Sequence, residues 1–593
     1  MIQVQVEREF TDNISKIREY KFNLVALIGL LVSLLLIVFC YQHFGSYFEE
    51  NDDPRFVMAM KGFATHLPFD NFMGFFYILT DDLYISLYKH FPNIGWYGLS
   101  MFLLLWGALF NIYISLYLSA KHIIVFPLFL LIFIAFYFLI FFQNVYWINF
   151  ARPTILVTSS FIILLSVLYL NIEIFKNNKW VLIFPVITYS LGHLTRLEAG
   201  YLGFVFGLVF SILLIYRQKS LLPFLLKFIL PVVFFILIVK VVGVFSEKRN
   251  GRNIEYLERT KIMRQLIDYK NVTEFVPKDI NERIVYDAVM VEYYFGDDKA
   301  ITIDFLRKLI KETSLWKSGN NKKFKMEFDV FVSSLGNENF IAAIINLSLF
   351  GFTLLWLLVS LKNNYKNFFR FLLFHLFYLA IIFGMCYFLK LPARIFNPLL
   401  VMWTIGNLIL AMSFIRFNKK KFYFFLSVPF FLILFGIPKF AKANNEFIAY
   451  YKKYGEVNRL MVDDINEKFH KTIFIPTSPR SWEMHNATDP INEINFKNGN
   501  SYVYLSIDIS QAPETKDQLF NMFGTSDHSE LFKNISKMNN VVFISDDNYV
   551  NFLGAYYHYL YKQDYYFETV FDYQPFFYQY TGLNYYRLKK ASQ

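Results

Sequence analysis

Long apolar stretches constrain this chain more than any other feature of its sequence. Of its 593 residues, 55% are hydrophobic and only 18% are charged, which leaves too little polar surface for a water-soluble protein of this length. An α-helix needs about 20 apolar residues to cross a hydrocarbon core about 30 Å thick. Most of the apolar stretches are near this length. We therefore predict eleven membrane spans, at residues 23–43, 95–118, 123–142, 153–172, 181–194, 199–216, 228–245, 339–360, 369–389, 395–415 and 423–440.

Basic residues in the short loops predict the orientation of these spans. With residues 1–22 in the cytoplasm, every predicted inner loop carries Lys or Arg, in agreement with the positive-inside rule. An odd number of spans then places the C-terminal residues outside. No small-residue cleavage site follows the first apolar run, so we expect an uncleaved anchor. The inner-loop basic residues are Lys121, Lys176, Lys179, Arg217, Lys219, Lys362, Lys366, Arg416, Lys419, Lys420 and Lys421.

Three longer polar segments are predicted on the outer side. In the first, 44–94, residues 52–64 and 70–88 predict amphipathic helices lying along the bilayer surface. The second, 245–338, is expected to be mostly helical. The third, 441–593, begins with an amphipathic helix and then mixes strand and helix patterns. The predicted fold is therefore a polytopic α-helical membrane domain, 23–440, of about eleven helices, followed by an extracytoplasmic α/β domain with strands at 472–477, 501–508, 541–546 and 583–590.

Composition and motifs exclude several classes of function. The net charge of +11 comes substantially from loop clusters that suit anionic lipid headgroups. These residues are spread along one membrane face, which argues against nucleic-acid binding. Cys40 and Cys386 lie in apolar runs and exclude a disulfide framework. The sequence has no P-loop, GxGxxG, HExxH or GxSxG motif, and no inner loop long enough for a nucleotide-binding domain, so an ATP-driven pump is disfavoured.

An acidic pair, Asp52-Asp53, follows the first span on the outer side. A partly desolvated carboxylate at the mouth of a membrane cavity has a raised pKa, which suits it to proton abstraction. Its neighbour has two open roles, holding an acceptor hydroxyl or binding a divalent cation that carries a phosphate. The alternative is that both side chains cap the following helix.

Basic residues at outer span ends form a second group of candidates. Arg152 and Arg394 each stand at an outer turn, and Lys240 lies near the outer end of its span. The planar guanidinium fork matches phosphate and cannot lose its charge, so Arg152 and Arg394 are candidates for binding the phosphate of a lipid-linked donor, and Lys240 is a further candidate contact. Snorkelling to headgroups or pairing with acidic partners is the alternative.

A third group consists of His193, Arg196 and Glu198, between two short predicted spans. These residues are candidates for the wall of a sugar pocket. The structural alternative, which the spacing favours slightly, is an Arg196–Glu198 pair that closes a hairpin. His66 is a further candidate for the pocket or for a metal ligand beside the acidic pair.

This pattern resembles the GT-C superfamily of polytopic glycosyltransferases. The matching stretches are Asn51-Asp52-Asp53 after the first span, the run from Gly62 to Tyr97, and Lys390-Leu-Pro-Ala-Arg394. The resemblance covers roughly residues 20–440, whereas 245–338 and the C-terminal region match no known pattern.

The resemblance implies a sugar transfer from a polyprenyl-phosphate donor to a glycan, lipid or protein acceptor. Asp52 or Asp53 would take the proton of the acceptor hydroxyl, and Arg394, helped by Arg152 or Lys240, would hold the donor phosphate. The acceptor oxygen would displace the lipid phosphate in a single inverting step. The implied location is the outer face of a bacterial plasma membrane.

Other functions stay open. An O-antigen-ligase-like transferase would depend on outer Arg and His residues rather than on an early Asp pair. A transporter or lipid flippase would require charges near the bilayer midplane and internal symmetry, and the sequence shows neither. A structural scaffold gives no reason for the placement of the acidic pair and the arginines.

Overall fold

The structure is a computed structural model of the whole chain. It describes residues 2–49, 52–62, 78–121, 123–216, 218–249, 262, 303–304, 307, 319–336, 339–388, 391–414, 419–477, 488–503, 520–525, 528–562, 564–571, 575 and 577–590, and every structural statement below concerns these residues. His66 and most of 245–338 lie outside them.

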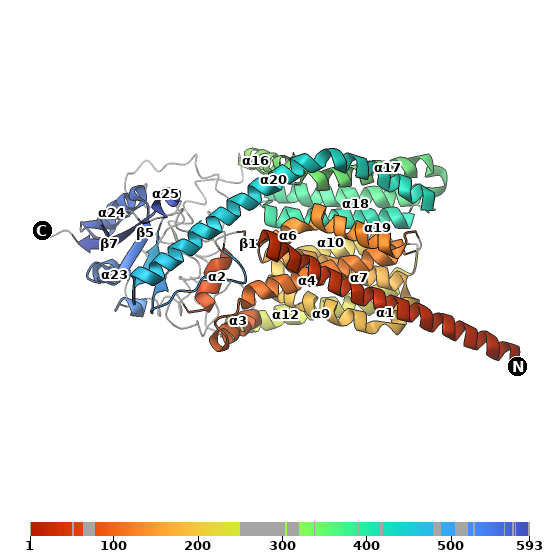
Figure 1. Cartoon of the computed structure of the whole chain (residues 1–593), viewed down its shortest axis with the longest axis horizontal. Coiled ribbons are helices and arrows are strands. Elements are labelled where there is room, and N and C mark those ends of the chain that lie inside the picture. Colours follow the sequence, from red (N-terminus) through yellow and green to blue (C-terminus); the bar gives the residue numbers. More distant parts are fainter. Residues whose placement is uncertain are drawn as a thin grey trace.

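A bundle of apolar helices forms the larger part of the molecule (Figure 1). Nine helices of the described chain are long and apolar enough to cross a membrane, and each matches a predicted span. The protein is therefore a polytopic helical membrane protein. The nine are Lys21–Phe44 within α1 (Ile2–Phe44), α4 (Trp96–Ala120), Phe126–Tyr146 (α5, η1 and α6), α7 (Ala151–Leu170), α10 (Leu197–Ile215), Leu221–Gly243 (α11, η3 and the start of α12), α17 (Phe340–Val359), Asn364–Tyr387 within α18 (Leu361–Phe388), and α19 (Ala393–Phe414).

The two remaining predicted spans are also helical, but they differ from the other nine. The span 181–194 corresponds to α9 (Ile183–Thr195), whose 13 residues extend about 20 Å, less than the thickness of a bilayer core. The span 423–440 is the first part of α20 (Lys419–Lys468), which has 50 residues and extends about 75 Å. Helix α20 packs along α17 and continues beyond the bundle, so no break occurs at the predicted domain boundary near residue 440 (Figure 1).

Helix α7 lies at the centre of the bundle and is the most buried of the nine apolar helices. It contacts α4, α9, α10 and α19. Its serine and threonine hydroxyl groups donate to carbonyls three or four residues earlier in the chain, as Thr154 does to the Phe150 carbonyl at 2.9 Å and Thr158 to the Thr154 carbonyl at 2.7 Å. Gly203 of α10 allows close approach, because a Cβ atom there would lie 2.8 Å from the Ile155 carbonyl oxygen. Small residues and internally bonded hydroxyls thus permit tight packing inside a membrane.

The C-terminal region contains a five-stranded sheet of order β4-β3-β5-β7-β6. Strands β4 (Ser501–Tyr502), β3 (Ile473–Pro476) and β5 (Val541–Ser545) are parallel, whereas β7 (Asn584–Lys590) and β6 (Tyr565–Thr569) join antiparallel. Helices α23 (His528–Ile535) and α24 (Asp547–Tyr561) belong to the same region. The predicted strands 472–477, 541–546 and 583–590 are confirmed as members of this sheet, the predicted strand 501–508 is confirmed at Ser501–Tyr502 while its residues 504–508 lie outside the described part, and β6 was not predicted.

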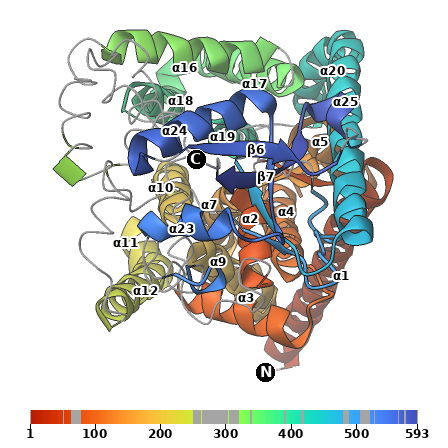
Figure 2. The same cartoon turned by 90° about the vertical axis from the view of Figure 1, so that its left-hand side faces the viewer.

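The first outer segment lies between the bundle and the sheet (Figures 1 and 2). Strand β1 (Tyr47–Phe48) pairs in parallel with β2 (Trp147–Ile148), which precedes α7. Parts of both predicted helices are confirmed, as α2 (Asp52–Met60) and α3 (Ile78–His90), whereas residues 63–77 lie outside the described part. However, residues 53–60 of α2 are all buried, so α2 does not rest on a bilayer with one exposed polar face. It is covered because Met58 packs into a cluster with Val457, Met461 and the C-terminal sheet. Within 245–338, α16 (Gly319–Gly336) is helical.

We predict that Gly203→Ala lowers the free energy of unfolding by about 1–3 kcal/mol, because the added methyl group overpacks the α7–α10 contact. Thermal unfolding of the purified protein in detergent measures the change. Gly351→Ala in α17 is the matched control, since a Cβ there meets no described atom within 4 Å. Equal midpoints for Gly203→Ala and Gly351→Ala would show that this contact is not tight.

Candidate functional site

Pairing of β1 with β2 places the segment after the first span beside the N-terminus of α7. The contact is extended by Ser46, which donates to the Val145 carbonyl at 2.8 Å, and by the Glu49 N–H, which donates to the Ile148 carbonyl at 2.7 Å. Charged residues from distant parts of the chain consequently lie together. We call Glu49, Asp53, Arg152 and Arg394 the outer cluster, after the predicted location of these residues, and it lies at the end of the bundle that faces the sheet.

The Asp53 carboxylate is fully buried and accepts three hydrogen bonds. Tyr97 Oη donates to Oδ1 at 2.6 Å, Asn149 Nδ2 donates to Oδ2 at 3.0 Å, and the Phe150 N–H donates to Oδ1 at 3.3 Å. Burial raises the pKa of Asp53 to about 7, the hydrogen bond from Tyr97 opposes this rise, and the negative charge of Glu49 adds to it. A carboxylate with a pKa near neutrality can exchange a proton at physiological pH.

Asn149 connects Asp53 to the start of α7. Its Oδ1 accepts the Ala151 N–H at 2.9 Å, while its Nδ2 donates to Asp53. The same side chain therefore satisfies one of the first N–H groups of the helix and orients the carboxylate. The positive end of the α7 dipole also favours negative charge at this position.

Arg152 and Glu49 form a buried ion pair, with Arg152 Nε 2.6 Å from Glu49 Oε2. The Arg152 side chain has no exposed surface, and its guanidinium carbon lies 4.7 Å from the centre of the Trp147 ring. Within the described chain, Nη1 and Nη2 of Arg152 have no hydrogen-bond acceptor. Buried guanidinium N–H groups are costly to leave unpaired, so they mark a place where an anion would be stabilised.

Arg394 joins the outer cluster from the start of α19. It is partly buried and interacts electrostatically with Glu49. Glu49 also interacts electrostatically with Asp53. The structure therefore brings together three of the predicted site residues, Asp53, Arg152 and Arg394, around a carboxylate that was not predicted.

The third candidate group divides into an Arg196–Glu198 pair and a separately buried His193. Arg196 forms an ion pair with Glu198 at 3.1 Å, and the Glu198 side chain is 74% exposed, as in the structural alternative of a local pair. Arg196 also lies 5.4 Å from the centre of the Phe150 ring, next to the outer cluster. His193 is instead buried among aromatic rings, with Tyr201 5.2 Å and Phe235 6.2 Å away. It packs α9 against α10 and α12 (Leu230–Arg249).

The other predicted residues are not placed in the outer cluster. Lys240 is an exposed residue of α12, and no described contact joins it to the cluster. Asp52 is the first residue of α2, but its side chain lies outside the described part, as does His66.

Three residues of the site were not predicted from the sequence, namely Glu49, Tyr97 and Asn149. Glu49 lies in the predicted outer segment 44–94, just before the acidic pair, and nothing in its local pattern distinguishes it. Tyr97 and Asn149 stand next to Trp96 and near Arg152, but nothing in their local patterns distinguishes them. A contact across distant segments is needed to find such partners.

A second buried carboxylate links the C-terminal region to the outer segment. Glu493 Oε2 lies 3.0 Å from Lys61 Nζ, and Tyr88 Oη donates to Glu493 Oε1 at 2.6 Å. Tyr88 Oη in turn accepts the Tyr97 N–H at 3.0 Å, so this network reaches the residue that binds Asp53. Burial raises the pKa of Glu493 to about 7, although the charge of Lys61 opposes the rise.

The described residues contain no group of three His, Cys, Asp or Glu side chains that would hold a metal ion. The divalent cation remains a prediction, because its predicted ligands include Asp52 and His66.

Comparisons with known proteins gave no match, whether with protein-family models, curated proteins or solved structures.

We predict that Asp53 and Glu493 make the folded protein less stable as the pH rises from about 4 to about 7. Each has a folded-state pKa raised to about 7 from an ordinary value of 3.8 or 4.5, so the folded state keeps a proton that the unfolded state loses. Each group contributes a slope of about 1.4 kcal/mol per pH unit to the free energy of unfolding in this window and none above it.

Asp53→Asn and Glu493→Gln should each remove this contribution from the pH dependence of thermal unfolding. Asp463→Asn, at an exposed residue of α20, is the control, and a variant slope equal to that of the wild type would contradict the prediction.

Proposed function

We propose that this protein is a membrane glycosyltransferase that moves a sugar from a polyprenyl-phosphate donor to an acceptor hydroxyl. The observation that carries the proposal is the outer cluster, in which a buried carboxylate with a near-neutral pKa lies near the Arg152 guanidinium, whose Nη1 and Nη2 have no acceptor in the described chain. Proton abstraction and phosphate stabilisation are the two chemical tasks of such a transfer.

The donor phosphate is assigned to Arg152 and Arg394. Arg152 pairs through Nε with Glu49, and Arg394 interacts electrostatically with the same carboxylate, so the two guanidinium groups lie near one another. A phosphate oxygen at Nη1 and Nη2 of Arg152 would satisfy N–H groups that the described protein leaves unpaired. The same charges would stabilise the lipid phosphate as it leaves.

The base is assigned to the acidic pair, with Asp53 as its described member. The acceptor O–H bond breaks as the carboxylate takes the proton, and the acceptor oxygen forms a bond to the anomeric carbon. The bond from that carbon to the phosphate oxygen breaks at the same time, and polyprenyl phosphate leaves with the electron pair. This single displacement inverts the anomeric centre and requires no separate acid, because the phosphate is already a good leaving group. The acceptor class is a lipid, glycan or protein, and the proposed location is the outer face of a bacterial plasma membrane.

We predict that Asp53→Asn and Asp52→Asn reduce sugar transfer, by about 10²–10⁴-fold for whichever residue is the base. Transfer is measured with the purified protein and a panel of radiolabelled polyprenyl-phosphate-linked monosaccharides. Asp463→Asn is the matched control, since this exposed carboxylate pairs with Arg459 on α20, at 3.1 Å. Full transfer activity in both Asp52→Asn and Asp53→Asn would remove the proposed base and favour a ligase-like enzyme.

We predict that the double variant Glu49→Gln/Arg152→Gln weakens donor use by about 10- to 100-fold, because a charged hydrogen-bond donor to phosphate is lost. Replacing both partners avoids leaving a buried charge unpaired. Steady-state kinetics separate the effect on donor KM from the effect on kcat. An unchanged donor KM and kcat would show that Arg152 does not bind the donor.

A further inference from the structure

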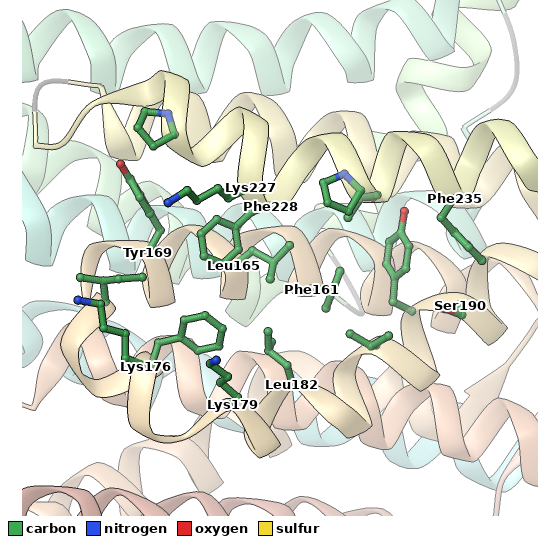
Figure 3. Close-up of a pocket in the computed structure, with 17 residues that line it drawn as sticks. Phe161, Leu165, Tyr169, Lys176, Lys179, Leu182, Ser190, Lys227, Phe228 and Phe235 are labelled. Carbon is green, nitrogen blue, oxygen red and sulfur yellow. The ribbon is translucent and has the colours of Figure 1, made fainter.

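A groove of about 720 Å³ lies at the other end of α7, between the segment 161–190 and the segment 223–235 (Figure 3). Its walls are mostly apolar, with Phe161, Leu165 and Leu182 on one side and Phe228 and Phe235 on the other. Three lysines, Lys176, Lys179 and Lys227, line one end. The groove thus has an apolar body and a basic end.

A π-turn, η3 (Leu225–Ile229), shapes one wall of the groove. Pro223, Lys227, Pro231 and Phe235 all line the groove at intervals of four residues. In a regular α-helix, positions 12 residues apart point in directions about 120° apart, because each residue turns the chain by about 100°. A π-turn absorbs one extra residue, so 12 positions that include it rotate by only as much as 11 regular ones. Pro223 and Phe235 therefore point in directions only about 20° apart. The π-turn therefore keeps a lysine and the apolar residues on one continuous surface.

The basic end of the groove lies on the face of the bundle opposite the outer cluster. Helix α7 starts at Ala151 beside the cluster and ends at Leu170, next to the segment that carries Lys176 and Lys179. Trp180, also in this segment, is 40% exposed and donates from its indole N–H to Asn23 at 2.7 Å. Tryptophan and lysine are typical of the membrane–water boundary, so the lysines lie at headgroup depth and the apolar walls extend into the hydrocarbon.

The lysines at this end remain accessible. Lys176, Lys179 and Lys227 are all exposed residues, and Glu173 is the one described carboxylate that forms an ion pair with them, at 3.4 Å from Lys176. Tyr169 closes the end of the groove, since its hydroxyl donates to the Ser220 carbonyl at 2.7 Å and its carbonyl accepts from Lys219 at 2.9 Å. The three lysines and Glu173 therefore give this end of the groove a net positive charge, next to the apolar walls.

We propose that this groove binds an anionic glycerophospholipid of the leaflet opposite the outer cluster. The phosphate lies among the three lysines, and an acyl chain lies along the walls formed by Phe161, Leu165, Phe228 and Phe235. Charge complementarity selects an anionic headgroup over a zwitterionic one, because each lysine near a lipid surface contributes independently to the attraction. This site is independent of the proposed transferase function, since it lies at the other end of the bundle.

The test measures binding of a fluorescent phosphatidylglycerol to the purified full chain in mixed micelles, with unlabelled phosphatidylcholine as competitor. Each of Lys176→Gln, Lys179→Gln and Lys227→Gln should weaken binding by about five-fold, and the triple variant by about 100-fold. Lys366→Gln is the matched control, since this exposed lysine of α18 belongs to the same predicted membrane face and lies 5.1 Å from the centre of the Tyr365 ring. It should bind as the wild type does.

A second variant tests the apolar part of the groove. Val186→Trp adds bulk to the lining without changing a charge, and it should weaken binding of phosphatidylglycerol at least ten-fold. Wild-type affinity in the triple lysine variant or in Val186→Trp would overturn the proposal. Equal competition by phosphatidylcholine would also overturn it, because the groove would then bind lipid without regard to charge.

Discussion

The buried ion pair between Glu49 and Arg152 is the contact on which the arrangement of the outer segments depends. Removing two charges from water costs several kcal/mol per ion, and their attraction offsets this cost only when the geometry is well fixed. Pairing of β1 with β2 provides that geometry through backbone hydrogen bonds. The ion pair and the strand pair together hold the segment after the first span against the start of α7, and this position brings Asp53 to Asn149.

Helix α7 extends from the outer cluster to the opposite end of the bundle. Its serine and threonine hydroxyls donate to nearby carbonyls of the same segment and Gly203 lets α10 approach closely, so the helix is tightly packed. Its first turn carries Arg152 and its last turn carries Tyr169, which closes the lysine-lined groove. The outer cluster and the lysine-lined groove thus lie at opposite ends of one helix. A substitution that shifts α7 would affect both of them, whereas a substitution at either end affects one.

The sequence predicted the features that depend on local composition and missed those that depend on long-range contact. The span at Trp96–Ala120 follows from apolar length, and Arg152 and Arg394 were found because arginine at an outer span end is unusual. The burial of α2 could not be predicted, since its pattern is that of a surface helix until Met58 meets Val457. Strand β6 was missed because it is a largely exposed edge strand without clear alternation.

Access to the outer cluster depends on the contacts that cover it. Neither Asp53 nor Arg152 has exposed surface, so no ligand reaches either group unless a covering segment moves. The cover includes residues 488–496, which Glu493 joins to Lys61 and Asp489 joins to Tyr41. Gly98 lies directly under Pro490, where no side chain fits. The described structure is thus a closed state, and a ligand that binds only after this segment moves must supply the free energy of these contacts from its own binding. A phosphate that satisfies the Nη groups of Arg152 is one such source, because those groups gain hydrogen bonds that the closed state of the described chain does not provide.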